Sequence, residues 1–342
     1  MARGILWGSL VLTPVAVLAR FAFHLDATPL FLLSAAALIP LAWLIGEATE
    51  HAAQHTGPGI GGFLNASFGN APELIIALFA VADGLPNVVR GTIAGSVVSN
   101  ILLVLGIAMI FGGEGRVDAR SLRWQLAAVF GAMVLLLVPS IPRWAGDPSR
   151  HSLYLVTLPV SVVLLAVYLV VTVRNLRIHR GAERDEAREG AWTLGRALAW
   201  LTVATAATAV VSEILVHSLE AFGHAVGLHE FFIAAVIVAI VGNAAEHGGA
   251  VVIAHRGDTV LATEIAITSS MQVAVFVAPA VALLSWLVGE GLPLSFRVIE
   301  VATMAAAAAL ATLVVWDGTS KRWEGFLLAS VYGGVVVAYF FS

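Results

Sequence analysis

A chain of 342 residues of which 59% are hydrophobic and only 12% are charged has the composition of a membrane protein, not of a soluble domain. The lack of cysteine excludes disulfides, thiolate metal sites and thiol nucleophiles. The net charge of −4 combines loop groups with intramembrane groups, so it indicates no charged partner, and we expect no nucleic-acid partner.

Eleven segments of the sequence are apolar over about the 20 residues that a helix needs to cross a bilayer. The connections are short and rich in turn residues, for example HTGPG (55–59) and ADGLPN (82–87). We therefore predict an all-α integral membrane protein that spans a lipid bilayer. The predicted spans are 5–22, 30–54, 59–82, 87–111, 121–141, 152–174, 194–220, 229–255, 260–288, 295–316 and 323–341. The first also resembles a signal peptide, and its cleavage would leave ten spans.

Basic residues predict the orientation. With the N-terminus inside, most arginines and the single lysine fall on the inner loops and flanks, so the positive-inside rule favours N-in and C-out. The alanine and arginine bias suggests a bacterial inner membrane.

One long hydrophilic connector, 174–196, divides the chain on the inner side. We interpret it as a solvated linker, with a regulatory acidic segment as the alternative.

The sequence contains an internal repeat. FGNAPELIIA (68–77) resembles VGNAAEHGGA (241–250), and aligning their Gly-Asn pairs places Glu73 on Glu246. Two copies of five spans must run in opposite directions, which is the inverted repeat of many secondary transporters. The predicted divisions are an N-terminal helix (1–28), a first five-helix repeat (29–175), a cytoplasmic linker (176–193) and a second five-helix repeat (194–342).

Both glutamates lie near the middle of a span, where a charge costs on the order of 2.5 to 3.5 kcal/mol and indicates function. Glycine, and Pro72 in the first motif, weaken the helix just before each glutamate. Carboxylate, amide and carbonyl oxygens suit a hard cation such as Ca²⁺. Two facing carboxylates repel, so one Ca²⁺ or two protons neutralise them. The predicted cation ligands are Glu73, Glu246, Asn70, Asn243, Gly69 and Gly242.

These motifs, with GSVVSNILLVLG (95–106) and SSMQVAVFVAP (269–279), resemble the two signature repeats of the cation/proton exchanger family in the calcium/cation antiporter superfamily. The resemblance covers roughly 45–110 and 210–280. It implies export of cytosolic Ca²⁺ against H⁺ by alternating access, with Glu73 and Glu246 binding the ions and no cofactor. Sodium/calcium exchangers, a sister family, carry threonine after the motif glycine and an aspartate in the second repeat, so the asparagines here favour protons as the counter-ion. The implied polar lining is Ser96, Ser99, Asn100, Ser269, Ser270 and Gln272.

Further polar groups predict the ion routes. We expect spans 2 and 7 to act as gates and their acids and histidines to form proton and cation pathways on opposite sides, with snorkelling interfacial groups as the alternative. His247 either tunes Glu246 or packs between helices. Asp83, Glu230, Asp258 and Glu264 lie near predicted helix ends and are interpreted as solvated or capping groups. The predicted pathway residues are Glu50, His51, Glu213, His217 and His247.

Two alternative functions stay open at this point. The same machinery could exchange Na⁺, K⁺ or Mn²⁺ for H⁺ or Na⁺. A distant alternative is an intramembrane metalloprotease, because His51 and His55 have the i, i+4 spacing of zinc ligands, although no glutamate lies between them. The sequence leaves open whether the chain forms a homo-oligomer.

Overall fold

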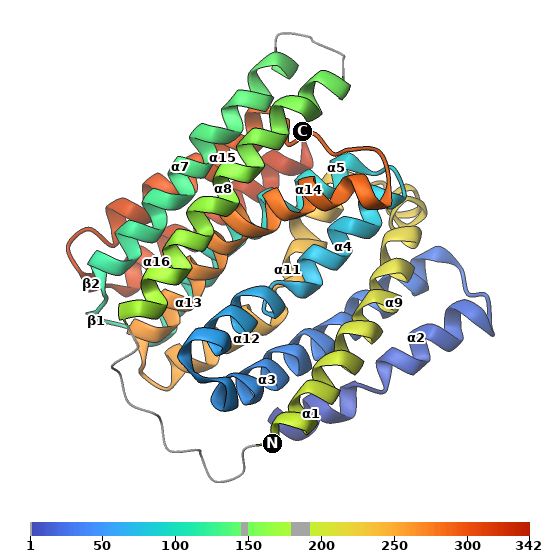
Figure 1. Ribbon diagram of the computed structural model, residues 1–342, viewed down its shortest axis with the longest axis horizontal. Coiled ribbons are helices and arrows are strands. Elements are labelled where there is room, and N and C mark those ends of the chain that lie inside the picture. The colour runs from blue at the N-terminus through green and yellow to red at the C-terminus, as the bar shows by residue number, and fades with distance from the viewer. Residues whose placement is uncertain (1, 145–149, 179–191) are drawn as a thin grey trace.

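The computed structural model describes residues 2–144, 150–178 and 192–342, which are almost entirely helical (Figure 1). In chain order the helices are α1 (Ala2–Ser9), α2 (Leu12–Phe21), α3 (Ala27–Phe68), α4 (Ala71–Ala82), α5 (Pro86–Val98), η1 (Ser99–Val104), α6 (Leu105–Gly112), α7 (Ala119–Trp144), α8 (Arg150–Ile178), α9 (Leu194–Val226), α10 (Glu230–Phe232), η3 (Ile233–Val238), α11 (Ala239–Gly242), α12 (Ala244–His255), α13 (Thr259–Gln272), η4 (Val273–Val277), α14 (Ala278–Val288), α15 (Val298–Val314) and α16 (Arg322–Phe340), where η marks a π-helical segment. Most of the predicted linker lies outside the described residues, so the division into repeats stays a prediction.

The predicted all-helical membrane fold is confirmed. Eight described helices are long and apolar enough to cross a membrane, and the pair formed by residues 230–242 and 244–255, bent by 58°, would make a ninth span. Two predicted spans correspond to α4 and α15, which are apolar but shorter. The number of eleven spans is therefore not confirmed.

The predicted turn at 55–59 is helical instead. Residues 27–68 form the single helix α3, yet the chain reverses direction within it. A Cβ added to Gly61 would lie 2.9 Å from the Cβ of Ala53, although eight residues of straight helix cover about 12 Å. The glycines of this stretch allow the bend without a break in helical structure.

The loops gather on two opposite faces of the molecule. On one, which we call the β face, strand β1 (Gly115–Arg116) pairs antiparallel with β2 (Thr319–Ser320), and Gly112 lies against Thr259. On the other, the indole of Trp144 donates to the backbone oxygen of Phe296 at 2.9 Å. The predicted inner loops are those of the β face, and the predicted outer loops are those of the opposite face.

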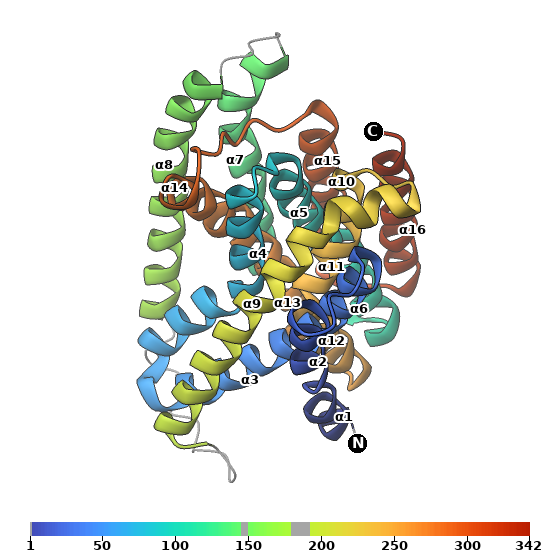
Figure 2. The same ribbon diagram turned by 90° about the vertical axis from the view of Figure 1, so that its right-hand side faces the viewer.

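The two halves of the chain interlock. Helix α6 of the first half packs on α16 of the second so closely that a Cβ on Gly106 would lie 2.8 Å from the backbone oxygen of Gly325. Helices α7 and α8 likewise pack on α15 and α14 (Figures 1 and 2). Small residues allow this backbone contact between helices.

A second group of helices, α1, α2, α3 and α9, packs along one side of this unit (Figure 2). Helices α3 and α9 contact each other along much of their length, with Phe31 stacked on Phe222 at 4.2 Å at one end. At the other end the ring of Trp7 lies 5.6 Å from Trp43 and 5.4 Å from Trp200. This end has a hydrophobic cluster of its own, separate from the main core.

Candidate ion-binding site

Two interrupted helices start at the centre of the molecule. Asn70 caps α4 with φ −97° and ψ 15°, and Asn243 caps α12 with φ −90° and ψ 15°. Two residues, 69 and 70, separate α3 from α4, whereas Asn243 alone separates α11 from α12. The break is shorter in the second motif, which has Ala245 where the first has Pro72.

The helices then leave the site in opposite directions. Helix α4 ends at Ala82, next to Asp83 on the face opposite β1 and β2, where His217 lies 3.8 Å from it. Helix α12 ends at His255, whose ring contacts Phe111 beside the β face. This geometry is that of the predicted inverted repeat.

The motif carboxylates occupy equivalent positions and come together. Glu73 and Glu246 are each the third residue of their helix, and their charges are close enough to interact. The carboxyl carbon of Glu73 lies 3.8 Å from the position that a Cβ on Gly242 would take, which is van der Waals distance. The structure thus places the first carboxylate against the second motif.

Glu73 is buried and Glu246 is half-buried, and their buried oxygens have no hydrogen-bond partner in the described part of the chain. Glu73 is 2% exposed, and among the described residues neither of its oxygens has a hydrogen-bond partner. Oε2 of Glu246 is likewise buried and unpartnered within the described chain. An unpaired buried carboxylate is costly unless a cation or proton neutralises it, so the site is built for a positively charged ligand.

Side-chain amides lie around the carboxylates, and the hydrogen bonds between them follow the internal repeat. Asn70 donates to Oε1 of Gln272 at 2.8 Å, and Asn100 donates to Oδ1 of Asn243 at 3.1 Å. Aligning residues 95–106 with 267–278 makes Asn100 and Gln272 equivalent in the repeat, so each motif asparagine pairs with the corresponding amide of the other half. The predicted polar lining is therefore brought together by the fold.

Asn100 is at the centre of this network. Its amide also donates to Ser269 at 3.1 Å, and its Oδ1 accepts from Nε2 of His247 at 3.1 Å. Asn243 in turn donates to Oγ of Ser96 at 2.8 Å. His247 thus packs between helices through a hydrogen bond to the lining, next to Glu246.

The remaining serines contribute less to this frame. Ser99 donates to the backbone oxygen of Ser96 at 3.3 Å, within its own helix. Ser270 donates to the backbone oxygen of Val97 at 3.0 Å and so joins α13 to α5.

Replacing Asn100 with alanine should lower the free energy of unfolding by about 1 to 3 kcal/mol, because Oδ1 of buried Asn243 loses one of its donors and Nε2 of His247 loses its acceptor. Thermal unfolding in detergent measures the change. Ser99→Ala is the matched control, since its hydroxyl bonds only within its helix, and should leave stability nearly unchanged. Equal losses in both variants would contradict the central place of Asn100.

Of the predicted pathway residues, the structure brings His247 to the site but not the other four. Glu50, Glu213 and His217 are exposed on α3 and α9, and no contact described for them reaches the carboxylates. His51 stacks on Trp192 at 4.7 Å and lies 3.5 Å from Glu47. Their role in ion movement stays a prediction.

The two histidines whose spacing suggested a metalloprotease, His51 and His55, both contact Trp192. Nε2 of His55 lies 2.7 Å from the backbone oxygen of Trp192, on whose ring His51 stacks. Within residues 2–144, 150–178 and 192–342, no group of three or more His, Cys, Asp or Glu could hold a metal ion. The geometry gives this alternative no support.

One residue read as a solvated or capping group caps no helix and is only partly accessible. Glu264 is half-buried on α13, and its Oε2 accepts from Nε2 of Gln125 of α7 at 2.6 Å. By contrast Asp258 does cap α13, because its carboxylate accepts from the backbone of Leu261 at 3.0 Å. The polar Gln125 inside an apolar predicted span was the signal in the sequence.

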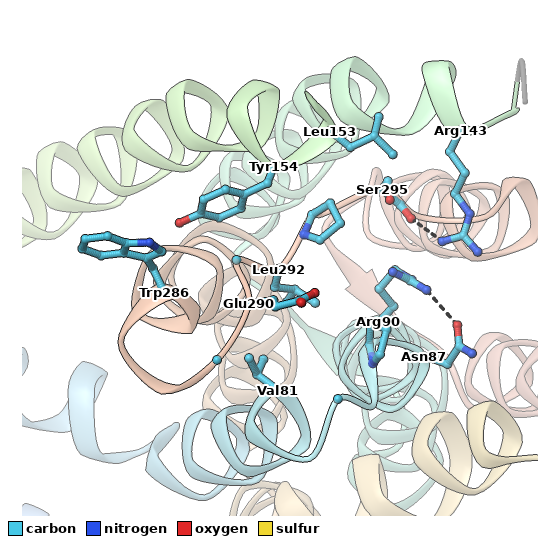
Figure 3. A pocket seen from close by; sticks show the side chains of 15 residues that line it. Val81, Asn87, Arg90, Arg143, Leu153, Tyr154, Trp286, Glu290, Leu292 and Ser295 are labelled. Carbon is cyan, nitrogen blue, oxygen red and sulfur yellow. Dashed lines mark hydrogen bonds between the residues drawn. The ribbon is translucent and has the colours of Figure 1, made fainter. Parts of the chain in front are cut away.

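A pocket of about 770 Å³ lies at the face opposite β1 and β2 (Figure 3). Arg90 donates to Asn87 at 2.7 Å and Arg143 to the backbone oxygen of Ser295 at 2.9 Å, and both guanidinium groups line it. Because guanidinium groups repel a divalent cation, this pocket is not the ion site.

Known proteins match both halves of the chain. The sequence profile of the sodium/calcium exchanger protein family matches residues 27–177 and, separately, 196–341. The Ca(2+)/H(+) antiporter of Aphanothece halophytica is 34% identical over 98% of this chain and 96% of its own length, and the Ca(2+)/H(+) antiporter ChaA of Bacillus subtilis is 35% identical over 96% of each. The solved structure of native YfkE aligns with a TM-score of 0.85 and 30% identity over 99% of this chain and 100% of that one. The chain belongs to the sodium/calcium exchanger protein family.

Proposed function

We propose that the protein is a Ca²⁺/H⁺ antiporter that exports cytosolic Ca²⁺ in exchange for protons. The observation that carries this function is the pair of carboxylates Glu73 and Glu246, whose buried oxygens have no hydrogen-bond partner in the described chain and which side-chain amides surround. Relatives that match nearly the whole chain are named Ca(2+)/H(+) antiporters. Carboxylate and amide oxygens are the ligands that Ca²⁺ prefers.

The charges of the site explain why the ions exchange. One Ca²⁺ or two protons neutralise Glu73 and Glu246, whereas the empty site carries two buried negative charges. In this mechanism the protein switches between its inward-open and outward-open states only when the site is neutral. Ca²⁺ therefore cannot cross in one direction unless protons cross in the other. Transport is then coupled without any covalent chemistry.

The side chains around the carboxylates support protons as the counter-ion. Asn70, Asn243 and Gln272 are neutral, and two of the three amides bond to each other across the halves. The sodium/calcium exchanger pattern has an aspartate in its second repeat, whereas these three side chains add no negative charge to the two glutamates. In the cell we place the β face, with its Arg116 and Lys321, in the cytoplasm of a bacterium.

The test is Ca²⁺ uptake into proteoliposomes under an imposed pH gradient. We expect uptake when the lumen is more acidic than the medium, so that protons leave as Ca²⁺ enters, and collapse of the pH gradient should stop it. A sodium gradient without a pH gradient should drive no uptake. If Na⁺ or K⁺ dissipates the pH gradient and Ca²⁺ does not, the protein exchanges another cation and the substrate proposed here is wrong.

A further inference from the structure

One face of α13 is polar and partly accessible from Glu264 to Gln272, which lies at the ion site. Glu264, Thr268 and Gln272 follow one another at intervals of four residues, so they lie on one face of the helix. All three are half-buried, whereas Ser269 and Ser270 on the other side are buried. An accessible polar face inside a membrane protein indicates contact with water, not with lipid.

Hydrogen bonds join this face to the neighbouring helix. Gln125 of α7 donates to Glu264 at 2.6 Å and accepts from Oγ1 of Thr268 at 2.7 Å. Its amide also donates to Ser121, one turn closer to the β face, at 3.1 Å. At the far end Gln272 accepts from Asn70, the residue that caps the helix of Glu73. Polar groups therefore continue from the end of α13 to the site.

The polar face ends just beyond the site. The next residue at the same interval is Phe276, whose ring stacks on Tyr168 of α8 at 4.9 Å. Apolar rings thus follow Gln272, and polar groups reach the site only from the β-face end of α13.

The equivalent face in the first half is different. By the repeat alignment it consists of Thr92, Ser96 and Asn100 on α5 and η1, and all three are buried. It has a threonine in place of Glu264 and therefore no carboxylate. Only one of the two related routes is accessible, and only that one carries a negative charge.

We propose that Glu264, held in place by Gln125, receives Ca²⁺ from the β face and passes it along α13 to Glu73 and Glu246. This inference rests on the proposed function. A carboxylate near the membrane is costly, and a glutamine at this position could share hydrogen bonds with Gln125 equally well. The negative charge is therefore useful for what it attracts: it raises the local cation concentration at the opening of the route.

The experiment compares Glu264→Gln with the parent in vesicles of both orientations. With Ca²⁺ added at the β face, the variant should have a KM for Ca²⁺ about tenfold higher and a kcat close to that of the parent. With Ca²⁺ added at the opposite face, the KM should not change. Glu264→Asp, which keeps the charge, should restore most of the affinity.

Asp258→Asn is the matched control, because it removes a carboxylate from the start of the same helix while asparagine still caps it. Its KM should equal that of the parent. An unchanged KM at the β face in Glu264→Gln, or an equal loss of kcat from both faces that Glu264→Asp does not restore, would overturn the inference. These outcomes can be read only if the parent protein exchanges Ca²⁺ for protons. If the parent shows no such exchange, the result refutes the proposed function and not the role of Glu264.

Discussion

Replacing either Glu73 or Glu246 with glutamine should reduce the initial rate of Ca²⁺ uptake by on the order of a hundredfold or more. Glutamine keeps the size of the side chain but not its charge, and Ca²⁺ then meets one carboxylate instead of two. A loss of about 2.8 kcal/mol in cation binding corresponds to that factor. The measurement is uptake of radioactive Ca²⁺ into proteoliposomes under a pH gradient.

The matched control is Glu220→Gln, which removes an exposed carboxylate from α9 and should transport like the parent. The double variant Glu73→Gln, Glu246→Gln should be no worse than either single variant, because the two residues act as one site. Substantial pH-driven uptake in either single variant would show that Ca²⁺ is bound elsewhere.

Replacing Gly95 with alanine should lower the free energy of unfolding by about 3 kcal/mol or more, or prevent folding. Gly95 and Gly91 form a small-xxx-small pattern on α5 that packs on Ala234 and Ala235 of η3. A Cβ on Gly95 would lie 2.7 Å from the Cα of Ala235 and would overlap its carbonyl group. The neighbouring residue is Ser96, which bonds to Asn243, so uptake should fall as well.

Gly131→Ala in α7 is the control, since an added Cβ there meets no atom within 4 Å. It should be neutral or more stable than the parent by up to about 1 kcal/mol, because alanine favours the helix. Thermal unfolding in detergent and the yield of folded protein report both variants. Similar stability of the two would mean that α5 and η3 are not in such close contact.

The motif helices could be predicted because their signal is local and occurs twice. A glycine and an asparagine before a glutamate interrupt a helix wherever it packs, and both interruptions have nearly the same backbone angles. The odd number of spans in each repeat then required opposite directions, which α4 and α12 follow. The turn at 55–59 was wrong because glycine bends a helix as readily as it ends one.

Contacts between distant helices could not be predicted from local patterns. The bond between Gln125 and Glu264 joins residues 139 positions apart, and nothing near either of them specifies the other. The π-helical segments η3 and η4 also depend on packing, because their sequences are those of ordinary apolar helices. Glu264 consequently resembled an end group in the sequence although the fold partly buries it.

The interlocked halves limit how the protein can switch between an inward-open and an outward-open state. Rocking of one half against the other as rigid bodies would have to separate Gly106 from Gly325 and pull α7 and α8 away from α15 and α14. Helices α3 and α9 contribute to the main core, but with α2 they also have small hydrophobic clusters of their own at their contacts with one another. The conformational change is therefore expected to be a displacement of these few helices over a stationary frame, so that most of the protein keeps one structure throughout the transport cycle.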